Sequence, residues 1–190
     1  MHFKRFLDIK PEISNLFIIF INNKVLYDLN DKTFLLNSSF LNFTSFEFKK
    51  IGIAQDNNIN IYAAHLSNEP FNVSNQGYQS LVEYDLRYLM TILSEKDLGL
   101  LGRANQLLHY LNSTKHCSYC GSVMEFDSTE EAMFCKCNNL MIYSKISPCV
   151  LALIKKDNQI LLARNAIFPE GLYSALAGFI EVSETAEETV

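Results

Sequence analysis

The sequence predicts an α+β fold in which a β-rich N-terminal domain is followed by short helices, a cysteine ribbon and further strands. Three observations predict this order: apolar hairpin patterns between residues 16 and 64, helical spacing of leucines between residues 81 and 111, and four cysteines between residues 117 and 137. The chain has 190 residues, of which 48% are apolar and 19% charged, so it can bury a sizeable core.

Composition excludes several classes of protein. The formal net charge of −5 disfavours a protein that coats duplex nucleic acid, although recognition of a single nucleotide end stays open. The longest apolar runs, residues 16–21 and 149–154, fall far short of the roughly 18 residues of a membrane span. The N-terminus lacks a secretory pattern. We therefore expect no membrane partner and a cytoplasmic location.

Two hairpins are predicted in the N-terminal part. Residues 16–21 and 24–29 are apolar runs joined by Asn22-Asn23, and asparagine tolerates the positive φ that tight hairpin turns require. Residues 51–64 repeat the pattern around an Asp-Asn-Asn turn. Together these runs predict a small sheet.

Two helices are predicted next. Residues 81–93 are expected to form the first, and Ser94 is expected to cap the second. The second helix carries apolar residues at helical spacing along one face: Leu100, Ala104, Leu107, Leu108 and Leu111. Such a stripe favours packing into the core over contact with a ligand.

Four close cysteines predict a metal site. Cys117, Cys120, Cys135 and Cys137 lie in one short segment, and without an export signal such pairs favour metal binding over disulfides. Two thiolates on a tight turn and two returned by a hairpin, residues 123–126 and 131–134, would form a zinc ribbon. Four protein ligands leave no open position for substrate, so the zinc is predicted to be structural.

The fourth zinc ligand stays open. Cys135 and Cys137 are separated by one residue where the usual ribbon has two. Asn138, which stands where a fourth cysteine would normally lie, is a poor zinc ligand. His116 can replace Cys137 in a site of three cysteines and one histidine. The other alternative is a set of buried or redox-active thiols without metal. The fifth cysteine, Cys149, is interpreted as a core thiol.

The C-terminal part is predicted to contain strands at residues 148–154 and 159–163. A helix is expected to begin near Thr185, which has capping-box spacing to Glu188. Just before it, Gly178 is followed after five residues by Glu184.

The ribbon, these strands and the Gly178 to Glu184 spacing together resemble the NADH pyrophosphatase branch of the Nudix hydrolases, also described as NAD-capped RNA hydrolases. Gly178 and Glu184 match the first half of the Nudix box. The resemblance implies an N-terminal domain over residues 1–112, a zinc ribbon over 113–145, and over 146–190 an incomplete Nudix domain, the N-terminal part of an α/β/α sandwich.

The resemblance also implies an activity, that of an NAD+ diphosphatase that splits NAD(H) into NMN(H) and AMP, or removes an NAD cap from RNA. The catalytic cation would be Mg²⁺ or Mn²⁺. The backbone carbonyl of Ala177 matches a contact to that cation, and Glu184 a supporting acid. Arg87, Glu130 and Tyr143 match substrate contacts. Ordinary structural roles stay open for these side chains.

The second half of the box, with its Arg-Glu and Glu-Glu pairs, is not among the 190 residues, so we expect the chain to be inactive alone. The alternative is a non-catalytic zinc-ribbon binding or dimerisation module. A single-strand nucleic-acid ribbon is disfavoured because the cysteines lack interleaved basic and aromatic residues. The family is usually homodimeric. Self-association is also expected because four apolar side chains should be exposed: Leu151, Leu153, Leu161 and Phe179.

Overall fold

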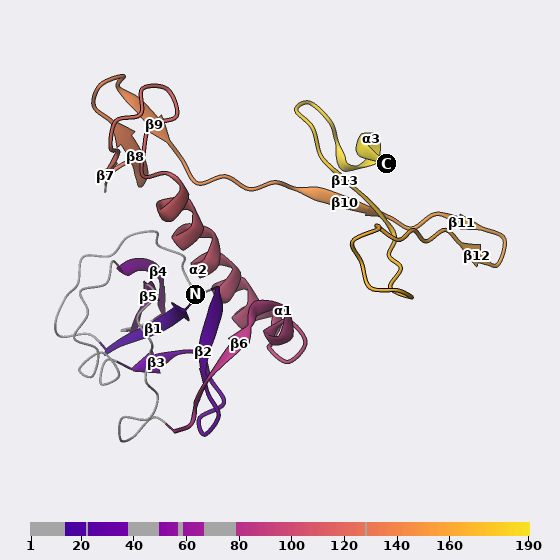
Figure 1. Ribbon diagram of the computed structural model, residues 1–190, viewed down its shortest axis with the longest axis horizontal. Coiled ribbons are helices and arrows are strands. Elements are labelled where there is room, and N and C mark those ends of the chain that lie inside the picture. Colours follow the sequence, from indigo (N-terminus) through magenta and orange to yellow (C-terminus); the bar gives the residue numbers. More distant parts are fainter. Residues whose placement is uncertain (1–13, 22, 38–49, 57–58, 67–78, 128) are drawn as a thin grey trace. The chain divides into compact units, whose positions relative to one another are not determined.

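The computed structural model describes residues 14–21, 23–37, 50–56, 59–66, 79–127 and 129–190 (Figure 1). Over these residues the protein is a mixed α and β structure with many strands and few helices. It divides into two compact units, Met1–Ser144 and Lys145–Val190. The N-terminal unit thus contains both the predicted sheet and the cysteine ribbon.

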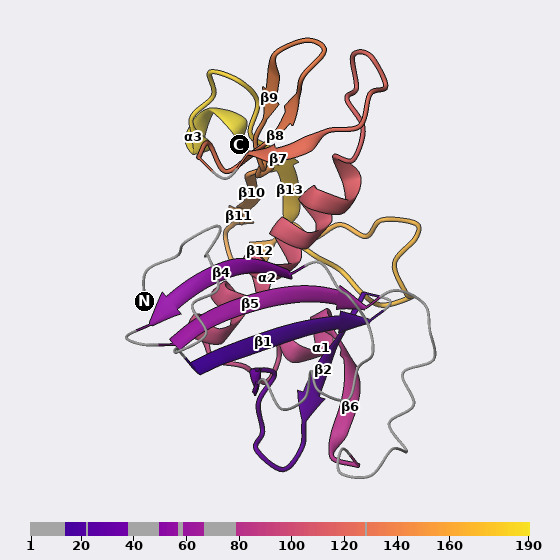
Figure 2. The same ribbon diagram turned by 90° about the vertical axis from the view of Figure 1, so that its left-hand side faces the viewer.

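A six-stranded sheet forms the base of the N-terminal unit, with the order β4-β5-β1-β2-β6 and with β3 paired to β1. Figure 2 shows β4, β5 and β1 side by side. Neighbouring strands are antiparallel except β1 and β5, which are parallel. The strands are β1 (Ser14–Ile21), β2 (Lys24–Asp28), β3 (Leu36–Asn37), β4 (Lys50–Asp56), β5 (Ile59–Leu66) and β6 (Leu81–Asp85).

Both predicted hairpins are confirmed. β1 and β2 pair through Ile21 and Lys24, and Asn23 in the turn adopts a φ of 65°, which asparagine tolerates better than most residues. β4 and β5 pair antiparallel. The remaining predicted turn residues, Asn22 and residues 57–58, lie outside the described part of the chain.

The central strand β1 is buried on both of its faces. Its five residues from Phe17 to Ile21 are each at most 3% exposed. Because successive side chains of a strand point to opposite faces, β1 contributes to two separate clusters. Ile18 and Phe20 pack with Leu101 of the helix α2 (Glu95–Ser113), whereas Phe17 and Ile19 pack in the other cluster.

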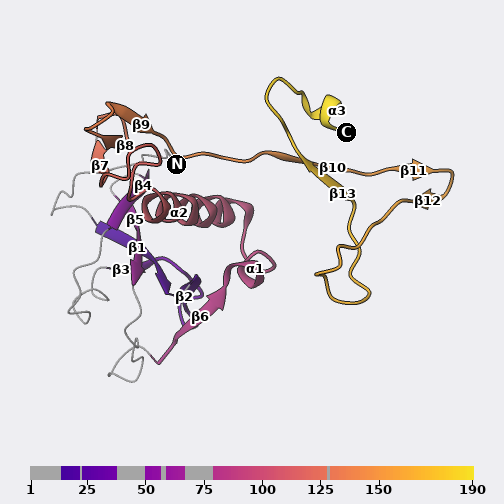
Figure 3. The ribbon, with the colours of Figure 1, turned by 45° about the horizontal axis from the view of Figure 1, so that its top comes forward.

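The predicted second helix is confirmed as α2, which Figure 3 shows along its length. Ser94 caps it, since its Oγ accepts a hydrogen bond from Asp97 N at 3.2 Å. The predicted apolar face packs on the sheet. Its members Leu100, Ala104, Leu107 and Leu108 are buried, and Leu111 is partly buried.

The predicted helix over residues 81–93 is wrong except for four residues. Leu81–Asp85 forms the strand β6 along the edge of β2, and only Leu86–Leu89 is helical, as α1. β6 alternates buried or half-buried with exposed side chains from Val82 to Asp85, which suits a sheet edge. Asp85 ends the strand and caps α1, because its Oδ1 accepts from Arg87 N at 2.8 Å.

The cysteine ribbon is a three-stranded antiparallel sheet of β7 (Glu125–Asp127), β8 (Ala132–Cys135) and β9 (Leu140–Ile142). The predicted hairpin is confirmed as β7 and β8, each displaced by one or two residues. β9 was not predicted. It follows a turn in which Asn139 has a φ of 49°, and its three residues are too few to show a period in the sequence.

The C-terminal unit contains two strand pairs and a short helix. β10 (Cys149–Ala152) pairs with β13 (Leu176–Phe179), and β11 (Lys155–Lys156) pairs with β12 (Gln159–Ile160). The predicted strands at 148–154 and 159–163 are thus shorter than expected, and β10 takes β13 as its partner. The helix α3 (Ala186–Thr189) begins at Thr185 with the predicted capping box.

Side chains of the C-terminal unit are mostly exposed. Cys149 is exposed, so its interpretation as a core thiol is wrong. The four apolar side chains expected to be exposed are 50–68% exposed: Leu151, Leu153, Leu161 and Phe179. In the described parts of both units, none of the helices combines the length and apolar character needed to span a membrane.

Candidate metal centre

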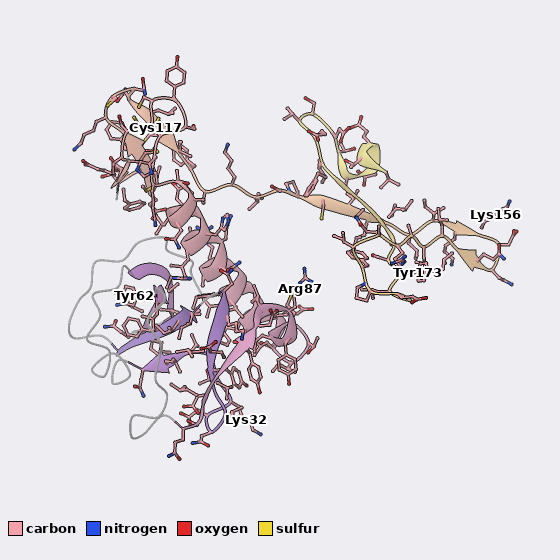
Figure 4. The ribbon with its side chains drawn as sticks, in the orientation of Figure 1. Lys32, Tyr62, Arg87, Cys117, Lys156 and Tyr173 are labelled. Atoms are coloured by element: carbon pink, nitrogen blue, oxygen red, sulfur yellow. The ribbon has the colours of Figure 1, made fainter. Side chains whose placement is uncertain are left out.

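Three of the predicted cysteines converge in the N-terminal unit. Among the described residues, the sulfurs of Cys117, Cys120 and Cys135 all lie within 4.8 Å of one another, and the Sγ atoms of Cys120 and Cys135 are 3.5 Å apart. Cys117 and Cys135 are buried, whereas Cys120 is exposed. Figure 4 labels Cys117 in the ribbon. We call these three residues the thiol cluster.

A tight backbone turn places the first two sulfurs. Gly121 N donates to Cys117 O and Cys117 N donates to Ser122 O, both at 2.8 Å. Gly121 has a φ of 74°, a conformation that strains any residue with a Cβ. The turn therefore depends on glycine, and it brings Cys120 back toward Cys117.

Tyr110, near the C-terminal end of α2, fixes the ribbon to the helix. Its hydroxyl accepts a hydrogen bond from Met133 N at 2.7 Å and donates one to the carbonyl of Ile142. One side chain thus holds both β8 and β9. Tyr110 also packs in a small buried cluster with Cys117 and Cys135, so the thiol cluster lies against the end of α2.

Hydrogen bonding and burial separate the acidities of two of the thiols. Hydrogen bonds from the side chain and backbone of Ser122 lower the pKa of Cys120 to about 6. Burial raises the pKa of Cys135. At neutral pH the Cys120 thiolate is available as a ligand, whereas metal binding has to displace the proton of Cys135.

The chemistry of the thiol cluster fits a thiophilic metal such as zinc. Thiolates are soft ligands that select zinc over magnesium or calcium, and two short loops deliver all three sulfurs to one point. Zinc takes four ligands in structural sites. The thiol cluster supplies three of them.

The other predicted ligands lie outside the thiol cluster. Cys137 is exposed and its Sγ lies 3.2 Å from Ser122 Oγ. His116 pairs through its backbone with Val123. The carboxamide of Asn138 instead faces the sulfurs, with Nδ2 3.8 Å from Cys135 Sγ and 4.0 Å from Cys117 Sγ.

A signal for Asn138 was present in the sequence. Cys135 and Asn138 have the same spacing as Cys117 and Cys120. When two equivalent turns build a site, the residues at the same position in each turn face it. Asn138 has the position of Cys120, whereas Cys137 lies between Cys135 and Asn138. The prediction placed Asn138 at this position but chose Cys137 or His116 as the ligand, because asparagine is a poor zinc ligand.

Two of the three predicted substrate residues lie together on the ribbon. Tyr143 OH donates a hydrogen bond to Glu130 Oε2 at 3.1 Å, and this bond raises the pKa of the Tyr143 phenol. Arg87 lies on α1, next to the start of α2, whereas Cys117 lies beyond its end (Figure 4). A helix of 19 residues is about 28 Å long, so one chain does not bring Arg87 to the pair.

The residues of the Gly178 to Glu184 motif lie in the C-terminal unit. Ala177 pairs with Leu151 in the β10–β13 ladder. A Cβ on Gly178 would meet only Thr189, at 3.7 Å, which is ordinary contact. The Glu184 carboxylate accepts from Glu181 N at 3.0 Å and from Thr189 Oγ1 at 3.2 Å. Glu184 therefore closes the loop before α3.

Curated proteins are similar to this chain. It is 32% identical over 173 residues to the NAD-capped RNA hydrolase NudC of Photobacterium profundum, a match that covers 90% of this chain and 60% of that protein. It is 38% identical over 110 residues to NAD-capped RNA hydrolase NudC of Escherichia coli O157:H7, covering 56% and 42%. The corresponding protein of Enterobacter sp. (strain 638) is 42% identical over 91 residues, covering 48% and 35%. No family model matches the chain.

The share of each protein that these matches cover decides which conclusion they support. The chain spans 60% or less of the length of these relatives. The longest match covers 90% of the chain, so it includes the thiol cluster in the middle of the sequence. We conclude that the chain is related to the NAD-capped RNA hydrolase NudC proteins of the Nudix hydrolase family.

Proposed function

We propose that this chain contributes to hydrolysis of the pyrophosphate of NAD(H), either free or as the 5′ cap of an RNA. The observation that carries this proposal is the 173-residue similarity to a protein named NAD-capped RNA hydrolase. The net charge of −5 agrees with recognition of one nucleotide end, because a protein that grips a long nucleic acid needs a basic surface.

We assign substrate contacts to Glu130, Tyr143 and Arg87. The bond between Tyr143 OH and Glu130 supports the first two, since it orients an aromatic ring on the exposed surface of the ribbon, where a base or nicotinamide can stack. Arg87 offers a guanidinium for a phosphate. Because Arg87 lies at the other end of α2, its contribution requires a second chain, as in the homodimer that the family resemblance implies.

Toward a catalytic Mg²⁺ or Mn²⁺ this chain offers the Ala177 carbonyl, with Glu184 in a supporting role. Such a cation neutralises a diphosphate and activates water. The two hydrogen bonds that Glu184 accepts favour the supporting role, because they hold the loop after β13 in place. The C-terminal unit is proposed to be part of a Nudix α/β/α sandwich.

The 190 residues carry only the first half of the Nudix box. We therefore propose that this chain alone does not turn over NADH. The test compares it with a chimera in which the C-terminal remainder of the Photobacterium profundum relative follows Val190, with Mg²⁺ or Mn²⁺ and chromatographic detection of AMP. We expect AMP from the chimera only. AMP production by the 190-residue chain above the control without protein would contradict the proposal of inactivity.

The proposed substrate contacts are tested in the same chimera. Tyr143→Phe removes the bond to Glu130 and keeps the ring, whereas Tyr143→Ala removes both. If Tyr143 stacks on substrate, the alanine variant raises KM for NADH more than the phenylalanine variant does. Tyr119→Ala, on the same ribbon and 83% exposed, is the matched control. Equal KM values for all three variants would remove Tyr143 from the substrate site.

A second candidate function is that of a non-catalytic binding or dimerisation module. It is favoured by the exposure of Leu151 and Phe179, each 68% exposed, in the C-terminal unit. Sedimentation of the 190-residue chain tests it over a range of concentrations. Self-association that the double variant Leu151→Ser/Phe179→Ser reduces would support the module. A monodisperse monomer would contradict it.

A further inference from the structure

The two turns of the ribbon offer the same positions to the metal. Cys117 and Cys120 face the site from the first turn, and Cys135 faces it from the second. The position equivalent to Cys120 in the second turn is Asn138, and its carboxamide is the polar group that lies beside the sulfurs of Cys117 and Cys135, at 4.0 and 3.8 Å. Equal spacing thus places an amide at the fourth corner of the site.

Cys137 lies beside Ser122 and outside the thiol cluster. Its sulfur contacts Ser122 Oγ at 3.2 Å, and its side chain is exposed. Among the described residues, the group of sulfurs that lie within 4.8 Å of one another does not include that of Cys137.

We propose that the metal is bound by Cys117, Cys120, Cys135 and the carboxamide oxygen Oδ1 of Asn138, with Cys137 outside the coordination sphere. This inference rests on the proposed metal site but not on NADH hydrolysis. Rotation of the carboxamide by half a turn about χ2 exchanges Nδ2 and Oδ1, so the oxygen can take the place that Nδ2 holds beside the sulfurs.

Such a centre differs chemically from one with four thiolates. The charge of a Zn²⁺ ion with three thiolates and a neutral amide is −1 instead of −2. The carboxamide oxygen is a harder and weaker ligand than a thiolate. Asn138 is exposed, so water reaches the fourth position. The centre should therefore bind its metal less tightly than a four-thiolate ribbon and exchange it faster.

Alkylation of the zinc-loaded 190-residue chain tests the position of Cys137. Metal-bound thiolates resist iodoacetamide, so mass spectrometry should find Cys137 and Cys149 modified out of the five cysteines. Modification of Cys149 alone would place Cys137 in the coordination sphere and overturn the proposal. Because this measurement uses the unmodified chain, it does not depend on the folding of any variant.

Cobalt titrations test the role of Asn138. Even outer-shell partners change metal affinity by about 10–100-fold, so loss of a direct ligand in Asn138→Ala should weaken Co²⁺ binding by at least that much. Asn138→Cys should tighten binding and raise the sulfur-to-cobalt charge-transfer absorbance by about one third, from three thiolates to four. Asn112→Ala, on the exposed side of α2, and Cys149→Ser are matched controls and should leave both readings unchanged.

The variant Asn138→Asp distinguishes two roles of the Asn138 side chain, that of a metal ligand through Oδ1 and that of a hydrogen-bond donor through Nδ2. A carboxylate oxygen is a good zinc ligand, so binding should be kept or tightened if Oδ1 binds the metal. If Asn138 only donates a hydrogen bond from Nδ2 to the thiolates, the carboxylate of the aspartate variant repels these thiolates and weakens metal binding. Weaker Co²⁺ binding by Asn138→Asp, or an unchanged affinity in Asn138→Ala, would overturn the role of Oδ1.

Loss of the charge-transfer absorbance in Cys137→Ser would overturn the exclusion of Cys137. NADH turnover by the chimera is measured separately, so its absence would bear on the proposed function alone.

Discussion

The strands β1 and β13 show how differently the two units are stabilised. Both belong to regular hydrogen-bonded ladders. In β1, the residues from Phe17 to Ile21 are at most 3% exposed, whereas every residue of β13 is exposed. Hydrogen bonds between strands contribute little net free energy, because the unfolded chain forms them with water. Apolar burial therefore stabilises the N-terminal unit, whereas the paired strands of the C-terminal unit gain little from it.

The largest expected effect comes from the core. Leu101→Ala, in a side chain that is fully buried between α2 and the sheet, should lower the free energy of unfolding by about 2–5 kcal/mol. Leu151→Ala, in β10 and 68% exposed, should change it by less than about 0.5 kcal/mol. Chemical denaturation followed by circular dichroism measures both. Equal losses in the two variants would contradict the difference between the units.

A smaller effect is expected where the ribbon joins α2. Tyr110→Phe leaves the buried Met133 N–H without its acceptor, so it should cost about 1–3 kcal/mol. Hydrogen exchange should show faster amide exchange in β8 and β9 but not in the six-stranded sheet. Tyr119→Phe, whose side chain is 83% exposed, is the control and should have no effect. Faster exchange throughout β1 and β5 would mean that the ribbon and the sheet unfold together.

The same capping interaction occurs in both units and should have different consequences. Ser94 caps the buried helix α2, and Thr185 caps the four-residue helix α3. Ser94→Ala should lower the free energy of global unfolding by about 1 kcal/mol. Thr185→Ala should change it by less than about 0.5 kcal/mol, because α3 has no buried residue. A larger loss in Thr185→Ala would show that α3 is packed against a surface in solution.

The smallest effect is a pH dependence at α3. Hydrogen bonds from the backbone and side chain of Thr185 lower the pKa of Glu188 below its ordinary value. A lowered pKa in the folded state contributes stability that is present above the ordinary glutamate pKa and is lost as the pH falls through the lowered one. The amide of Thr185 should then exchange faster at acidic pH than the intrinsic rate predicts. In Glu188→Gln, which keeps the side-chain oxygen, this dependence should disappear.

Much of the N-terminal unit was predictable because local patterns agree with the final packing. The Asn-Asn turn, the Ser94 cap and the leucine stripe of α2 each depend on a few neighbouring residues. Residues 81–85 were predicted wrongly, because their strand exists only through pairing with β2, which is distant in the sequence. β9 pairs with the neighbouring strand β8, and it was missed because its three residues are too few to show a period in the sequence.

For the metal centre, the sequence by itself determined that thiols gather in two short turns and that zinc chemistry is the natural use of them. Only the tertiary structure decided which side chains meet. It brings Asn138 to the sulfurs and leaves Cys137 beside Ser122, outside the thiol cluster, and it separates Arg87 from Tyr143 by the length of α2. Residue types fix which ligands a chain possesses. The direction of each side chain depends on the backbone geometry of its turn, which residue spacing alone does not specify.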